Sequence, residues 1–217
     1  MSVQASLALF DPTTDQLSDG ATLLRGFVRD AAALLAAVAE VATASPFRHL
    51  VVPGGHTMSV AMTNCGALGW VSDRAGYRYS PLDPSTGLAW PPMPDAFAAL
   101  ADAAALAAGF APFAPEACLV NRYVPGARLS LHVDRDERSG DVPIVSVSLG
   151  LPATFLWGGL ARGDPARRVR LEHGDVVVFG GPSRRVFHGV APLPKGSHPS
   201  TGECRINLTF RRARPLP

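Results

Sequence analysis

The sequence predicts an α+β chain that is mainly β, with two helices ahead of a sandwich or barrel of antiparallel strands. Two alanine-rich runs, at about 31–42 and 96–108, favour the helices. Beyond about residue 110, short segments of alternating apolar and polar residues follow one another, separated by glycine and proline. The 217 residues suffice for one domain with a sizeable core, so a single domain over 1–217 is expected.

The N-terminal part contains a strand and then a helix. Ala21 to Phe27 is predicted to be a strand, and Asp30 is expected to cap the helix of the first alanine-rich run. Both alanine-rich runs are short and are interrupted by Glu40 and Asp102. A membrane-spanning helix needs about 20 apolar residues, so both runs are expected to pack on the domain.

Between the two predicted helices, Pro46 to Gly87 is expected to be an irregular segment with strand-like stretches. Its aromatic residues, Trp70, Tyr77 and Tyr79, stand among glycines and polar residues without helical spacing. The second helix is predicted from about Pro94 to Ala108, and Gly109 is expected to end it.

The run from Arg128 to Asp134 alternates in a way that indicates a strand. Period two sends Leu129, Leu131 and Val133 to one face, and His132 and Asp134 to the other. A third candidate ligand, His188, lies in the stretch Arg184 to Val190 with apolar neighbours and a glycine, and must arrive on another strand. Two imidazoles and one carboxylate on one face of Fe(II) leave three coordination positions open for dioxygen and a bidentate co-substrate.

The C-terminal run from Cys204 to Arg211 predicts a strand with one polar face. Period two places Arg205, Asn207, Thr209 and Arg211 together, opposite Ile206, Leu208 and Phe210. Taken alone, this polar face is typical of a solvated sheet surface. Beside the metal triad it suits a small dicarboxylate, because each guanidinium can hold a carboxylate through two parallel hydrogen bonds.

Cysteine usage and the first residues of the chain favour a cytoplasmic protein. Cys65, Cys118 and Cys204 are odd in number, widely spaced and lack a C-x-x-C motif, so they are expected to be reduced packing thiols. The first residues show no basic segment followed by an apolar one, and no secretion signal is expected.

The charge of the chain says little about its partners. The net charge of +2 indicates a nucleic-acid partner only weakly. Local clusters of arginine occur, among them Arg162 with Arg167, Arg168 and Arg170.

Several stretches of the sequence resemble the bacterial AlkB family of iron(II)- and 2-oxoglutarate-dependent nucleic-acid dealkylating dioxygenases. The resemblance covers about 45–211, and the stretches that carry it are Pro53 to Gly66, Leu68 to Trp70, Asn121 to Tyr123, Leu129 to Glu137, Pro143 to Gly150 and Arg205 to Arg211. It implies a double-stranded β-helix, or jelly roll, over about 115–213 with a nucleotide-recognition insert at about 46–90.

The resemblance also implies a reaction and a set of roles. The protein would use Fe(II), 2-oxoglutarate and O2 to demethylate N-alkylated bases such as 1-methyladenine and 3-methylcytosine in single- or double-stranded DNA. The reaction would release formaldehyde and succinate. The protein would be a monomer without membrane contact. The implied metal ligands are His132, Asp134 and His188; the implied co-substrate residues are Asn121, Tyr123, Arg205, Asn207 and Arg211; the implied substrate residues are Met62, Trp70, Tyr77, Asp136 and Arg162.

Within these roles, Arg205 is expected to pair with the distal carboxylate of 2-oxoglutarate, and Arg211 to lie by the carboxylate next to the keto group. Trp70 is expected to stack on the flipped base, with Tyr77 near a phosphate. Asp136 would favour a cationic methylated base over its neutral parent. A solvated acid within a charged run is the plainer interpretation of Asp136.

The sequence leaves other functions open and departs from the family in places. His56 stands where tyrosine is expected, and Val52 replaces a hydroxyl-bearing residue; both lie in the insert that the resemblance assigns to nucleotide recognition. The same chemistry on RNA or on a protein side chain remains an alternative, as does a non-catalytic metal-binding barrel.

Overall fold

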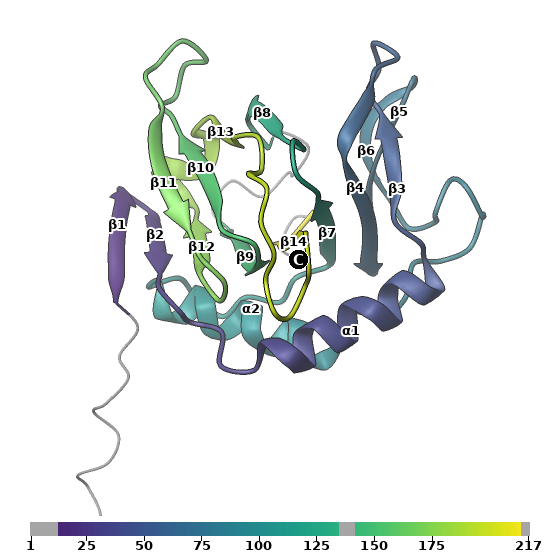
Figure 1. Cartoon of the computed structure of the whole chain (residues 1–217), viewed down its shortest axis with the longest axis horizontal. Helices are drawn as coiled ribbons and strands as arrows, with labels where there is room; N and C mark the ends of the chain where they lie inside the picture. Colours follow the sequence, from purple (N-terminus) through teal and green to yellow (C-terminus); the bar gives the residue numbers. More distant parts are fainter. Residues whose placement is uncertain (1–12, 135–141, 214–217) are drawn as a thin grey trace, which may run out of the picture.

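Two alanine-rich helices cover one face of a large antiparallel sheet, and a smaller sheet faces it from the other side (Figure 1). The computed structural model describes residues 13–134 and 142–213. The elements are β1 (Thr14–Ser18), β2 (Ala21–Leu24), α1 (Ala31–Ala44), β3 (Arg48–Val51), β4 (Thr57–Gly66), β5 (Gly69–Asp73), β6 (Gly76–Ser80), α2 (Asp95–Ala107), β7 (Ala117–Tyr123), β8 (Leu129–His132), β9 (Ile144–Gly150), β10 (Ala153–Trp157), β11 (Arg167–Leu171), β12 (Val176–Phe179), a 3-10 helix (Gly181–Arg185), β13 (His188–Val190) and β14 (Arg205–Arg211).

Among the described residues, the strands form two facing sheets and one separate hairpin. The major sheet has the order β1-β2-β12-β9-β14-β7-β4-β3, and the minor sheet has the order β11-β10-β13-β8. β5 and β6 form the hairpin, which stands beside β3 and β4 in Figure 1. The arrangement confirms the predicted double-stranded β-helix with two helices.

The two faces of the major sheet belong to two different cores. One face packs against the helices, where Val147 and Leu208 belong to the same buried cluster as Val38 of α1 and Phe97 of α2. The other face lies between the sheets, in a second cluster that includes Tyr123 of β7, Phe155 and Trp157 of β10, and Val190 of β13. The helices thereby support the sheet from outside and leave the space between the sheets for a site.

Both predicted helices form nearly as the sequence indicates. The Asp30 carboxylate accepts a hydrogen bond from the Ala33 N–H at 2.9 Å, which caps α1 as predicted. α2 ends within one residue of the predicted position, and Gly109 follows with φ +82°, a value that favours glycine. Neither helix in the described part of the chain has the length and apolar character needed to cross a membrane.

The strand-like stretches expected between Pro46 and Gly87 are confirmed as β3 to β6, and they make the segment more regular than predicted. The ten-residue β4 pairs with β7 inside the major sheet. Val60 to Cys65 are all buried, so both faces of β4 are covered and no alternation of apolar and polar residues marks the strand.

Smaller differences concern the first two strands. β1 was not predicted. Only Leu17 of its five residues is buried, so no alternation of apolar and polar residues marks the strand. β2 ends at Leu24 instead of Phe27 because the chain turns at Arg25 and Gly26, where Gly26 has φ +55°.

Candidate active site

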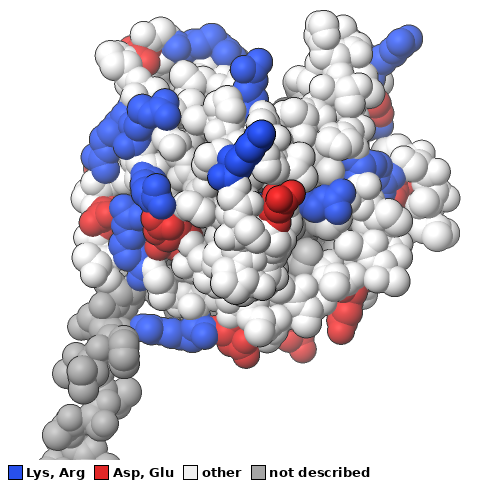
Figure 2. Space-filling view, viewed as in Figure 1, with Lys and Arg blue, Asp and Glu red and all other residues white. Residues whose placement is uncertain are grey.

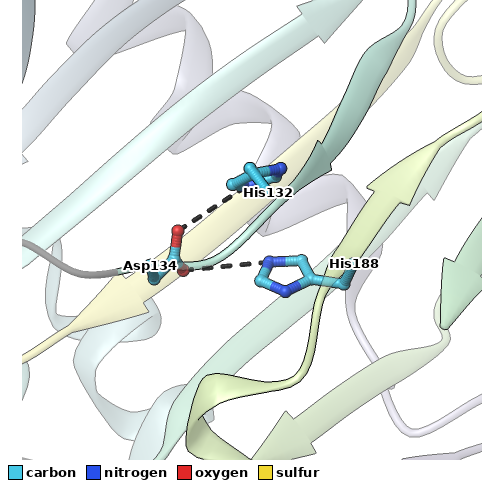
Figure 3. Close-up of side chains that lie close together, drawn as sticks. All are labelled: His132, Asp134 and His188. Carbon is cyan, nitrogen blue, oxygen red and sulfur yellow. Dashed lines mark ion pairs between the residues drawn. The ribbon is translucent and has the colours of Figure 1, made fainter. Parts of the chain in front are cut away.

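His132, Asp134 and His188 converge at one end of the minor sheet (Figure 3). Their potential ligand atoms all lie within 4.8 Å of one another. The Asp134 carboxylate is 3.6 Å from His132 Nε2 and 3.9 Å from His188 Nε2. One carboxylate facing two imidazole nitrogens is the donor set of a 2-His-1-carboxylate Fe(II) site.

Strand pairing brings the two histidines together, although they are far apart in sequence. His188 of β13 is the direct cross-strand partner of His132 of β8, and their ring centroids are 4.5 Å apart. The predicted strand from Arg128 to Asp134 ends at His132. The register also shifts between His188 and Val190, and Leu129, predicted to face away from the ligands, packs on the interior cluster. A β-bulge of this kind breaks simple alternation and redirects side chains.

Hydrogen bonds fix the tautomer of both imidazoles. His132 Nδ1 lies 2.9 Å from the Ser130 carbonyl, and His188 Nδ1 lies 3.0 Å from the Val186 carbonyl. A carbonyl oxygen only accepts, so each Nδ1 donates its proton and each Nε2 keeps its lone pair for a metal. Burial, followed by the nearby charge of His132, lowers the pKa of His188 to about 4, which keeps its ring neutral.

The Asp134 carboxylate is buried but remains an anion. Arg211 donates to Asp134 Oδ2 from Nε at 3.1 Å and from Nη2 at 2.9 Å. Burial by itself raises the pKa of Asp134, but the charge of Arg211 outweighs it and holds the pKa well below its usual value. The site therefore holds a permanently charged oxygen donor. The structure places Arg211 directly against this donor.

Arg205 is almost completely buried, with 1% of its surface exposed, and within the described structure part of its guanidinium lacks a partner. Its Nη2 donates to Ser148 Oγ at 2.9 Å, and its guanidinium carbon lies 5.0 Å from the centroid of the Tyr123 ring. Its Nε and Nη1 have no hydrogen-bond partner among the described residues. Buried charged donors are costly when unpaired, so a bound carboxylate is the natural partner.

The remaining predicted co-substrate residues lie beside Arg205 on the same face of the major sheet. Arg205 is the cross-strand partner of Tyr123, and Asn207 is the partner of Asn121. Burial raises the pKa of Tyr123, so its hydroxyl stays protonated as a donor. Asn121 donates to Asn207 Oδ1 at 3.2 Å, and its own Oδ1 has no partner within the described structure.

Asn207 is engaged by protein groups. Its Nδ2 donates to Ser146 Oγ and to the Val147 carbonyl, each at 2.9 Å. It therefore orients its neighbours. Arg205, Asn207, Thr209 and Arg211 are all buried, which excludes a solvated sheet surface for this face.

The predicted substrate residues occupy the neighbouring strands. Met62 of β4 is buried in the interior cluster and is the cross-strand partner of Asn121. Trp70 of β5 packs against the same cluster and stacks on Tyr77 of β6, with ring centroids 5.5 Å apart and an interplanar angle of 14°. Met62 and Trp70 also line a small cavity of about 100 Å³ that extends to Arg48 and Trp90.

Arg162 lies close to both ligand-bearing segments. Its Nη1 donates to the Leu131 carbonyl at 2.9 Å, and its guanidinium carbon lies 5.2 Å from the centroid of the Phe187 ring. Leu131 and Phe187 each precede a histidine of the triad. Asp136, the other charged candidate, lies outside the described residues.

Sequence reasoning missed three residues that order this site. Ser148 binds Arg205, Arg184 donates from Nη1 to the Asp134 carbonyl at 3.2 Å, and Asn64 holds the Trp70 backbone through two hydrogen bonds of 3.0 Å. A signal existed only for Ser148, because it alternates with valine and leucine along β9. Arg184 lies in a 3-10 helix and Asn64 in a strand buried on both faces, so no period marks either one.

Comparison with known proteins defines the class of this site. A model of the 2OG-Fe(II) oxygenase superfamily matches residues 20–211. The chain is 58% identical over 204 residues to the alpha-ketoglutarate-dependent dioxygenase AlkB of Escherichia coli (strain K12), which covers 94% of each chain. The chain belongs to the AlkB family.

Other AlkB relatives agree in sequence and in fold. The alpha-ketoglutarate-dependent dioxygenase AlkB homolog of Caulobacter vibrioides (strain NA1000 / CB15N) is 48% identical over 183 residues, or 84% of this chain and 81% of that one. The solved structure of OsALKBH1 is 29% identical, with a TM-score of 0.82 over 92% of this chain and all of that chain. The resemblance stated from the sequence is confirmed, and the protein is an Fe(II)/2-oxoglutarate-dependent dioxygenase.

The residues present fit both groups that an AlkB dioxygenase uses. His132, Asp134 and His188 supply two neutral nitrogens and one anionic oxygen for Fe(II). The unpaired donors of Arg205 supply a buried positive site for a carboxylate of 2-oxoglutarate.

Proposed function

We propose that this protein removes methyl groups from N-alkylated bases in DNA, such as 1-methyladenine and 3-methylcytosine, and releases formaldehyde and succinate. The observation that carries the proposal is the Trp70–Tyr77 stack, in which Trp70 packs on the interior cluster that includes Met62. An aromatic platform next to an oxidising site suits a base that has been taken out of its helical stack. The near full-length identity to E. coli AlkB agrees with this proposal.

In the proposed reaction, His132, Asp134 and His188 hold Fe(II), which supplies the oxidising chemistry when 2-oxoglutarate and O2 bind. Arg205 pairs with the distal carboxylate of 2-oxoglutarate through its two unpaired nitrogens, and Tyr123 and Asn121 complete that end of the site. Asn207 supports them by orienting Asn121.

Arg211 has a positioning role toward the metal in this proposal. It holds the Asp134 carboxylate through two donors and presents its positive charge at the end of the site where the carboxylate next to the keto group would lie. The protein groups thus provide geometry and charge, while the cofactor carries the oxidation.

On the substrate side, Trp70 forms one wall for the base and His132 forms the opposite wall. Met62 contributes an apolar surface, and Tyr77 and Arg162 lie toward the nucleic-acid strand. We assign the whole chain to a single domain, in which about 46–90 recognises the nucleotide and about 115–213 forms the catalytic core. We further propose that the protein acts as a monomer in the cytoplasm.

One assay tests the proposed function. The protein is mixed anaerobically with Fe(II) and 2-oxoglutarate, air is added, and formaldehyde and succinate are measured with methylated single-stranded DNA, duplex DNA, RNA, and no nucleic acid. The proposal requires that at least one methylated DNA yields formaldehyde in a one-to-one ratio with succinate. Formaldehyde release from methylated RNA alone would instead assign the same chemistry to RNA.

Replacing Trp70 with alanine is expected to weaken binding of a methylated oligonucleotide by about 1–3 kcal/mol, because the stacking surface for the flipped base is lost. Fluorescence anisotropy with a labelled oligonucleotide measures the effect. Trp70→Phe is the matched control, since it keeps an aromatic face and fills part of the same space. Wild-type affinity of Trp70→Ala for the methylated oligonucleotide would show that Trp70 does not stack on the flipped base.

Replacing Asp136 with asparagine is expected to reduce activity on 1-methyladenine and 3-methylcytosine more than on the neutral lesion 1-methylguanine. A carboxylate about 4 Å from a cationic base contributes about 1 kcal/mol even in a water-like dielectric, which is roughly fivefold in rate or affinity. Formaldehyde release from the three lesions in the same oligonucleotide context gives the comparison. Equal losses on all three lesions would show that Asp136 acts on structure instead of on charge.

A further inference from the structure

One row of cross-strand neighbours in the minor sheet runs from the metal ligands to the edge of the sheet. His132 of β8 lies opposite His188 of β13, His188 lies opposite Trp157 of β10, and Trp157 lies opposite Arg167 of β11. Directly opposed residues of antiparallel strands point to the same face. Arg167 therefore lies on the face of the sheet that carries the two histidines of the triad.

Arg167 marks the rim of the space between the sheets. The next residues of β11 on this face, Val169 and Leu171, are buried in the interior cluster opposite Phe155 and Ala153. Arg167 is exposed, so the filled interior ends at its position and solvent begins there. Adjacent strands are about 4.8 Å apart, which places the Arg167 backbone about 10 Å from that of His188, two strands away.

The charge of Arg167 is available to a ligand. In the described part of the chain, the side chain of Arg167 makes no hydrogen bond or ion pair, whereas that of Arg170 on the same strand pairs with Glu172. Arg162, from the loop that leads into β11, bonds the Leu131 carbonyl beside the triad. Figure 2 shows Lys and Arg side chains gathered on the side of the molecule where Figure 1 places β11.

We propose that Arg167 binds a phosphate of the nucleic-acid strand whose methylated base enters the metal site. The inference rests on the proposed function. A planar guanidinium matches two phosphate oxygens, and a flanking phosphate has to remain at the rim while the base is inside. Figure 1 shows β8, which carries His132, between the β10–β11 hairpin and the β5–β6 hairpin. Arg167 and the Trp70–Tyr77 stack therefore contact the nucleic-acid strand from opposite sides of the metal site.

Arg168 provides a matched control in the same strand. It is exposed like Arg167 and carries the same charge, but its cross-strand partner is Leu156, so it points to the outer face of the minor sheet. Replacing either arginine with glutamine removes one positive charge from the same edge of the protein. Only Arg167→Gln removes the charge from the face of the sheet that carries the histidines.

The test measures binding of a fluorescein-labelled single-stranded oligonucleotide with one 1-methyladenine, by anisotropy at several salt concentrations, under anaerobic conditions with Fe(II) and 2-oxoglutarate. Arg167→Gln is expected to weaken binding about two- to fivefold, and Arg167→Glu is expected to weaken it further. The slope of log affinity against log salt becomes shallower by about 0.7, the value of one single-strand phosphate contact. Arg168→Gln keeps the wild-type affinity and slope.

Two results would overturn the proposal: unchanged binding by Arg167→Gln, or equal weakening by Arg167→Gln and Arg168→Gln, which would indicate only general attraction by positive charge. Thermal unfolding midpoints confirm that the variants are folded. Failure of the proposed function is seen separately, as absence of formaldehyde release by the wild-type protein.

Discussion

Replacing His132 with alanine is expected to remove nearly all succinate formation and to leave the protein folded. Loss of one of three protein ligands is expected to reduce turnover by at least about 100-fold, since loss of an outer partner of a ligand already costs about 10- to 100-fold. The His132 side chain is about a third exposed, at 32%, so its removal leaves no large internal cavity. Succinate is measured with Fe(II), 2-oxoglutarate and methylated oligonucleotide.

Asp134→Ala gives the contrasting case, because it removes both a ligand and the partner of a buried cation. Arg211 is buried and donates twice to Asp134, so the substitution removes a carboxylate that compensates its charge. Such a loss costs about 3–5 kcal/mol of unfolding free energy, or on the order of 10 °C in unfolding midpoint for a chain of this size. The unfolding midpoints of His132→Ala and Asp134→Ala are compared with that of wild type in the presence of a chelator, so that bound metal contributes nothing to stability. Equal unfolding midpoints for the two variants would contradict the structural role of the Arg211–Asp134 pair, and undiminished turnover in either would remove that residue from the ligand set.

Replacing Arg205 with leucine is expected to weaken 2-oxoglutarate binding by about 2–5 kcal/mol, because the distal carboxylate of the co-substrate loses its buried charge partner. The structure adds an expectation about the ligand-free protein. Two buried nitrogens of Arg205 have no partner among residues 13–134 and 142–213, so wild-type protein carries a desolvation cost that leucine removes. Ligand-free Arg205→Leu should therefore unfold at or above the wild-type midpoint, while 2-oxoglutarate raises the midpoint only of wild type.

Thermal unfolding with and without 2-oxoglutarate measures both effects in one experiment, and the KM for 2-oxoglutarate gives an independent value for wild type. Ser148→Ala is the matched control, since it removes one hydrogen bond of Arg205 and keeps the guanidinium. Its effect on 2-oxoglutarate affinity should be about tenfold or less. An unchanged response of Arg205→Leu to 2-oxoglutarate would mean that Arg205 does not bind the co-substrate.

The sequence alone identified the candidate metal ligands and the arginines because chemistry restricts the residue types at such a site. His132 and Asp134 stand two residues apart, and His188 follows in an apolar run, so their side chains are recognisable as a donor set before any fold is known. Both helices were also predicted within two residues, since alanine content, an Asp30 cap and a Gly109 stop are local signals.

Only the tertiary structure decided which faces of the strands are buried and which groups pair. The alternation of polar and apolar residues from Arg205 to Arg211 is the same for a solvated surface and for the lining of a site. The minor sheet faces this strand, and the polar residues therefore line the site. The bulge in β8 that turns Leu129 inward depends on pairing with β13, and the regular strand β4 depends on coverage of both its faces. A sequence records the chemistry and periodicity of its own residues, whereas burial, register and ion pairs depend on segments distant in the chain, which come together only on folding.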